Sequence, residues 1–171
     1  TGGENAAFGY AALTLDTKGS HTVAIGPYAL QTQNFTTATD SFNTAVGYAA
    51  GTALTTGVQN TFVGGLAGDA ITDADTNVAV GYGSLTTDTL GSNSVAIGFA
   101  ALEAQNFTTA TNSYNVAVGS ATGAGITTGV QNTLIGGLAG DALTDADYNV
   151  AVGIEALSAD TLGSGSVAIG R

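Results

Sequence analysis

The chain has 171 residues, of which 44% are apolar, enough to form a core and to exclude a disordered polar tail. Its only cations are Lys18 and Arg171, against thirteen acidic residues, and the formal net charge is −11. We expect no nucleic-acid partner and no membrane contact by this segment, because binding to nucleic acid or to an anionic membrane surface relies on lysine and arginine. The chain has no cysteine, and no apolar run approaches the roughly 18 residues that cross a bilayer.

One phrase recurs along the chain, as "HTVAIG" (residues 21–26), "NSVAIG" (93–98) and "GSVAIG" (165–170). Its final glycine, here called the landmark glycine, returns after every 17 or 21 positions. The ten landmarks are Gly9, Gly26, Gly47, Gly64, Gly81, Gly98, Gly119, Gly136, Gly153 and Gly170. The order of these intervals also repeats, so that the segment 26–97 matches the segment 98–169 at 50 of 72 positions. Such self-similarity is typical of a solenoid.

Each unit has the same internal pattern. A small polar residue four positions before the landmark predicts a turn, and the next three residues, such as 95–97, predict a short strand. A second apolar piece, such as "FAAL" at 99–102, is too short for a stable helix and predicts a second strand. We therefore predict an all-β, parallel β-solenoid of ten rungs, forming one segment (1–171) of a longer fibre, since the chain begins at Thr1 without a methionine.

The residue before each landmark is β-branched or aromatic, and we expect these residues to stack at ~4.8 Å intervals as the core ladder. They are Phe8, Ile25, Val46, Val63, Val80, Ile97, Val118, Ile135, Val152 and Ile169. The residue before them is nearly always alanine, except at Phe62 and Leu134, where the landmark is followed by Gly65 or Gly137. Two interpretations stay open for this small-residue face: local repacking within the coil, or contact with another copy of the chain.

The two 21-residue units contain four extra residues within "QNFTTAT", at 33–39 and 105–111. Insertions in solenoids usually leave as loops and often carry binding. The candidate binding residues are Asn34, Phe35, Thr36, Asn106, Phe107 and Thr108. Phe35 and Phe107 are either exposed contact groups or caps over the edge of the coil. "NFT" also matches the N-glycosylation sequon.

Two acidic segments, "GDAITDAD" and "GDALTDAD", could hold calcium through oxygen ligands or form solvated, self-repelling loops. Their carboxylates are Asp69, Asp73, Asp75, Asp141, Asp145 and Asp147. The spacing matches neither an EF-hand nor the "GGxGxD" pattern of calcium-binding β-rolls. No other cofactor is expected.

A catalytic function is not expected. His21 is the only histidine, no nucleophile can be assigned to it, and we expect it and Lys18 to have structural roles. The glycine-rich stretches lack the helix and lysine of a phosphate loop. An alternative function is binding to ice or another flat lattice, which uses regular threonine ladders. Threonine triplet patterns occur at 37–39, 87–89 and 109–111, in only some of the units.

The three hexapeptides quoted above resemble the head repeats of trimeric autotransporter adhesins of the YadA type, and related repeats look like those in phage tail fibres. The resemblance covers nearly the whole chain. It implies a left-handed parallel β-roll, three identical chains side by side, an extracellular location on a cell surface or virion, and attachment to a host surface protein or glycan. The expected function is therefore that of a non-enzymatic, adhesive fibre segment.

Overall fold

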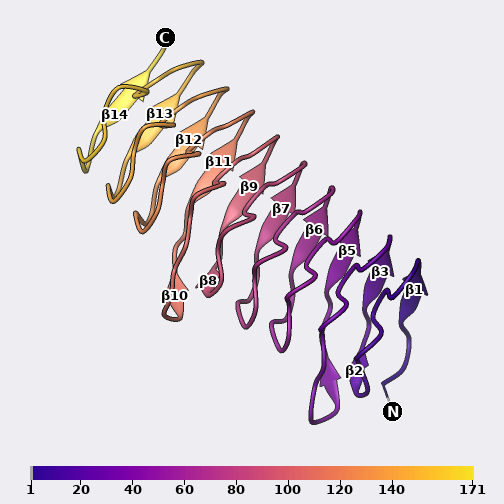
Figure 1. Cartoon of the computed structure of the whole chain (residues 1–171). Helices are drawn as coiled ribbons and strands as arrows, with labels where there is room; N and C mark the ends of the chain where they lie inside the picture. Colours follow the sequence, from indigo (N-terminus) through magenta and orange to yellow (C-terminus); the bar gives the residue numbers. More distant parts are fainter. Residues whose placement is uncertain (1) are drawn as a thin grey trace.

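Ten three-residue strands, one before each landmark glycine, stack side by side in a computed structural model that describes residues 2–171 (Figure 1). They are β1 (Ala6–Phe8), β3 (Val23–Ile25), β5 (Thr44–Val46), β6 (Thr61–Val63), β7 (Val78–Val80), β9 (Val95–Ile97), β11 (Val116–Val118), β12 (Thr133–Ile135), β13 (Val150–Val152) and β14 (Val167–Ile169). All neighbours pair in parallel and in register, as one ten-stranded sheet. The predicted all-β parallel solenoid is confirmed. No helix in the described residues is long and apolar enough to span a membrane.

The second wall of each rung is a stack of turns and not the second strand that the sequence predicts. Residues two and four positions after the landmark have left-handed backbone angles, for example Ala49 (φ 53°) and Gly51 (φ 59°). An extended strand needs negative φ at every residue, so the segment turns instead. These turns still bond from rung to rung: the Leu30 amide donates to the Ala50 carbonyl at 3.0 Å, and Gly51 donates to Ala67 at 3.0 Å.

The strands turn their middle residue inward and their first and third residues outward. The middle residues Ala24, Ala45, Phe62, Ala79, Ala96, Ala117, Leu134 and Ala151 are all 0% exposed. The third residues are those predicted as the core ladder: Phe8, Ile25, Val46, Val63, Val80, Ile97, Val118, Ile135, Val152 and Ile169. They align rung by rung as expected, but none is buried, and Ile97 and Ile135 are 37% and 42% exposed. Their assignment to the core is therefore wrong.

Large side chains from the turn wall explain why the sheet wall contributes mostly alanine. Leu30, Leu85 and Leu102 lie four positions after a landmark and are fully buried. In the other central rungs the large buried side chain lies seven positions after the landmark, at Leu54, Ile71, Ile126 and Leu143. Because a core packs to near-crystalline density, the facing strand has room only for a methyl group.

Phe62 and Leu134 are accommodated inside the coil, which settles the two interpretations of the small-residue face in favour of local repacking. The glycines that provide the space are Gly51 and Gly68 for Phe62, and Gly123 and Gly140 for Leu134. A Cβ atom added to Gly51 or Gly68 would lie 2.6 or 2.5 Å from the Phe62 ring. The glycine that follows the landmark, Gly65, contacts Tyr82 instead and does not compensate for Phe62.

The small polar residues four positions before the landmark lie inside the coil as a ladder. The Asn60 amide donates to Asn43 Oδ1 at 2.8 Å, and Asn60 Nδ2 donates to the Ala74 carbonyl at 2.8 Å. Asn77 repeats both bonds one rung later, to Asn60 Oδ1 at 2.9 Å and to the Gly91 carbonyl at 2.8 Å. The ladder thus satisfies backbone groups that would otherwise be buried without partners.

The two 21-residue rungs are anchored by polar pairs, of which Gln105 with Asp88 is fully buried. Gln105 Nε2 donates to Asp88 Oδ2 at 2.6 Å, while Asp88 Oδ1 accepts the amides of Gly91 and Phe107, both at 3.0 Å. In the corresponding pair 72 positions earlier, Gln33 Nε2 donates to Asp16 Oδ2 at 2.7 Å. Each insertion also adds a short parallel ladder, β2 (Gly19–Ser20) with β4 (Thr39–Asp40), and β8 (Gly91–Ser92) with β10 (Thr111–Asn112).

Candidate interaction surfaces

The outer face of the ten-stranded sheet is the largest regular surface of the rod. We define it as the first and third residues of the ten strands, which are threonine, alanine, valine, isoleucine and one phenylalanine. None of these strand residues carries a charge. On internal rungs, Ile25, Ile97 and Ile135 are 37–42% exposed. The sequence predicted the aligned columns but assigned them to the wrong side of the sheet.

Aromatic side chains extend the outer face along the N-terminal part of the rod. Tyr10, Tyr48, Tyr82 and Phe99 each follow a landmark glycine and are 57–73% exposed. The Tyr28 ring lies between those of Tyr10 and Tyr48, with centroids 5.4 and 5.9 Å away, both edge to face. Tyr82 and Phe99 stack with their centroids 6.1 Å apart. The corresponding positions in the other rungs include Pro27, Gly65, Ser120, Gly137 and Ile154, so the aromatic column is interrupted and ends at Phe99.

The inserted loops place their aromatic residues inside. Phe35 and Phe107 are only 5% exposed, which identifies them as caps over the coil rather than contact groups. Of the other candidate binding residues, Asn34, Thr36 and Thr108 are exposed and Asn106 is half-buried. The exposed Lys18 lies against the first inserted loop, where its Nζ donates to the Thr36 carbonyl at 2.6 Å. Polar atoms and backbone at the loop tips, and not the phenyl rings, are thus available to a partner.

The six clustered aspartates do not converge on one point. Among residues 2–171, no group of three or more histidine, aspartate or glutamate side chains has the arrangement of a metal site. Asp73 and Asp145 instead accept hydrogen bonds from Thr56 and Thr128 one rung earlier. The carboxylates of Asp75 and Asp147 accept backbone amides, those of Val58 and Val130, both at 2.8 Å. Asp69 and Asp141 complete the predicted set: Asp69 Oδ1 accepts Thr86 Oγ1 at 2.5 Å, whereas Asp141 Oδ1 is buried with no partner. This arrangement gives no support to the calcium prediction.

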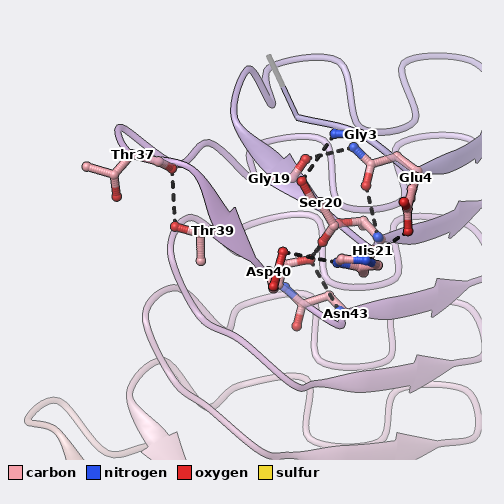
Figure 2. Close-up of polar contacts among 12 residues, drawn as sticks. Gly3, Glu4, Gly19, Ser20, His21, Thr37, Thr39, Asp40 and Asn43 are labelled. Atoms are coloured by element: carbon pink, nitrogen blue, oxygen red, sulfur yellow. Dashed lines mark hydrogen bonds and ion pairs between the residues drawn. The ribbon is translucent and has the colours of Figure 1, made fainter.

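His21 lies between two carboxylates on the edge of the rod near its N-terminus (Figure 2). Its Nε2 is 2.9 Å from Glu4 Oε2, and its Nδ1 is 3.1 Å from Asp40 Oδ1. The ring stacks on Phe42, with the centroids 5.0 Å apart. The three polar residues come from three successive rungs, which no sequence motif indicates because they are 17 and 19 positions apart.

A threonine and asparagine column that the sequence patterns did not reveal lies eight positions after each landmark. It consists of Thr17, Asn34, Thr55, Thr72, Thr89, Asn106, Thr127, Thr144 and Thr161. The hydroxyls of Thr55 and Thr72 donate to the carbonyl of the next rung, at 3.0 and 3.1 Å. Because these hydroxyls bond along the column, their donors do not point toward an external lattice. Lattice binding remains a prediction that thermal hysteresis would test.

A hollow of about 680 Å³ opens at the C-terminal end, lined by residues 155–160 and 167–171. It lies beside β14, the last strand of the stack, and its acidic residues are Glu155 and Asp160. Its lining includes no histidine or cysteine. The absence of catalytic function stays a prediction.

Comparison of the chain with protein-family models, curated proteins and solved structures finds no match.

Proposed function

We propose that the chain is a non-enzymatic fibre segment, a rigid rod that associates side by side with two identical chains. The rod would act outside the cell, on a cell surface or virion, and display its inserted loops to a host surface protein or glycan. The observation that carries the proposal is the uncharged, partly exposed outer face of the sheet, which runs through all ten rungs.

Charge distribution supports self-association through this face. The net charge of −11 opposes contact between copies, yet none of the thirteen acidic residues lies in the ten strands. The acidic residues lie outside the ten-stranded sheet, so its outer face is where like-charged chains can approach most closely. The aligned columns of valine and isoleucine also form a more continuous apolar surface than the scattered apolar residues that are normal on a monomer.

The resemblance of "NSVAIG" and its variants to adhesin head repeats supports the threefold arrangement and the adhesive role. A long rod with repeated loops suits attachment, because the two insertions project at a fixed 72-residue interval. Repetition of the same loop on one rod, and again on each chain, would allow weak contacts to combine into strong attachment.

Mass measurement in solution tests the oligomer. One chain has a mass of 16.6 kDa, and we expect about three times this mass at micromolar concentration. Ile97→Asp adds a charge to the outer face and should yield folded monomers, because a buried unpaired carboxylate opposes association. Thr87→Asp adds the same charge to an exposed turn and should leave the trimer intact. A stable wild-type monomer would refute the association, and a dimer would refute the threefold arrangement.

A further inference from the structure

The contacts of His21 couple three successive rungs at the N-terminal end. Glu4 precedes β1, His21 precedes β3, and Asp40 ends β4 (Figure 2). The His21 side chain is 37% exposed, and those of Glu4 and Asp40 are 78% and 62% exposed, so both contacts lie at the surface. Phe42 covers one face of the ring, with an angle of 17° between the two planes. The ring is therefore held with one nitrogen directed at each carboxylate.

Whether both nitrogens can donate a hydrogen bond depends on the protonation of the ring. A neutral imidazole has one N–H donor and one bare nitrogen, whereas the imidazolium ion donates from both nitrogens. Both partners here are carboxylate oxygens, which only accept hydrogen bonds when ionised. The neutral ring would thus leave a lone pair facing either Glu4 or Asp40. Only the protonated ring satisfies both contacts, with opposite charges on each side.

The equivalent residues 72 positions later, Thr76, Asn93 and Asn112, form a similar connection without charge. Thr76 Oγ1 donates to Asn93 Oδ1 at 2.8 Å, and Asn93 Nδ2 donates to Asn112 Oδ1 at 2.9 Å. An amide carries a donor and an acceptor at every pH, so this chain of bonds is independent of protonation. The two sites therefore differ in chemistry while they occupy the same place in the repeat.

We propose that Glu4, His21 and Asp40 form a proton-dependent clasp that fastens the rung of β1 to the next two rungs. In the described part of the chain, Glu4 and Asp40 are the charged side chains that contact the ring, and the remaining contact, Phe42, is uncharged. The clasp strengthens as the ring gains a proton and weakens as the pH rises and the proton is lost. Histidine is the side chain type that can gain or lose a proton in the physiological pH range, so we expect the attachment of β1 to the next two rungs to respond to mild acidification. The inference goes beyond the proposed fibre function and does not depend on it.

Hydrogen exchange at β1 tests the clasp. The Ala6 amide donates to the Thr22 carbonyl at 2.8 Å, so its exchange reports on detachment of the first strand. After correction for intrinsic rates, we expect the protection of Ala6 to be about threefold to tenfold greater near pH 5.5 than near pH 8, as for two partly exposed ion pairs. His21→Asn, which copies the residue at position 93, should abolish this difference. The equivalent amide 72 positions later, that of Val78, donates to the Ser94 carbonyl at 2.9 Å. It is the internal control, and its protection should be the same at both pH values.

Two further measurements make the result decisive. The chain has one histidine, so its ring ¹⁵N signals are unambiguous, and near pH 5.5 both nitrogens should carry protons that are slowed in exchange. The triple variant Thr76→Glu, Asn93→His and Asn112→Asp should transfer the pH dependence to the Val78 amide. Equal pH dependence of Ala6 in wild type and His21→Asn would overturn the proposal, as would a triple variant whose Val78 protection is unchanged by pH.

Discussion

At the scale of single residues, the landmark glycines are required by both conformation and space. Their φ angles lie between 120° and 142°, a region that residues with a Cβ atom rarely adopt. A Cβ atom on Gly81 would also lie 2.3 Å from the carbonyl oxygen of Gly98, the landmark of the next rung. Close approach of successive backbones at this corner thus explains why the same residue recurs in every unit.

Substitution of one landmark glycine should be far more harmful than substitution of a nearby glycine. We expect Gly81→Ala to lower the free energy of unfolding by about 3 kcal/mol or more, through backbone strain and the clash with Gly98. Gly83→Ala is the control: its φ is 63°, no atom lies within 4 Å of an added Cβ, and Ala49 and Ala100 occupy the equivalent position. Its cost should be about 1 kcal/mol. Urea denaturation measures both, and equal costs would contradict the role assigned to the landmark.

At the scale of the rung, two packing solutions alternate. Where leucine follows the landmark by four positions, the residue seven positions after it is aspartate or glutamine, as at Leu85 and Asp88. Where glycine lies four positions after the landmark, an aliphatic residue lies seven positions after the landmark, as at Gly68 and Ile71. Because each solution occupies two successive rungs, the repeat of the core is four rungs long, which accounts for the 72-residue period.

Moving side-chain volume from a strand to the facing turn of the coil tests whether the two walls pack against each other in this way. Phe62→Ala should lower the free energy of unfolding by about 3–5 kcal/mol, because it leaves a cavity. Adding Gly68→Leu should restore part of that loss, since Leu85 occupies the equivalent position with a similar φ of 54°. Gly65→Leu is the matched control and should restore nothing, because Gly65 contacts Tyr82 and not Phe62. Additive effects of Phe62→Ala and Gly68→Leu in a double-mutant cycle would contradict the packing described.

The sequence predicted the rungs correctly but reversed the faces of the strands, for a physical reason. Stacking requires the same residue type at the same position, so periodicity revealed the ten strands, whereas burial depends on the opposite wall. The larger size of Ile97 favours it over Ala96 for the core, yet Ala96 is buried with Leu102 in the core cluster and Ile97 is 37% exposed. The sequence does carry one signal for this packing: the large Phe62 on the strand occurs together with Gly68 on the facing turn. The contacts of His21 were not predictable, because the registers of three rungs create them.

At the scale of the whole molecule, the rod is a sum of neighbouring contacts. Each strand of the ten-stranded sheet pairs only with the strands of adjacent rungs, so stability should follow the number of rungs rather than a central core. The aspartate–glutamine pairs impose one constraint on this modularity. Asp16 and Asp88 lie seven positions after a landmark, and each accepts a hydrogen bond from the glutamine at the same position of the next rung, Gln33 or Gln105. A next rung without this glutamine would leave the carboxylate without its partner.

Removal of residues 26–97 should therefore give a shorter rod that folds. The deletion joins Ile25 to Gly98, keeps every landmark in register, and places Gln105 one rung after Asp16, where Gln33 was. With six of ten strands left, we expect the urea m-value to fall by about 40%, in proportion to the surface buried on folding. Removal of residues 30–97, only four residues fewer, places two landmarks four positions apart and should unfold the junction. Circular dichroism and urea denaturation of both variants decide the matter: if the two deletions are equally stable, register between rungs is not what holds the rod together.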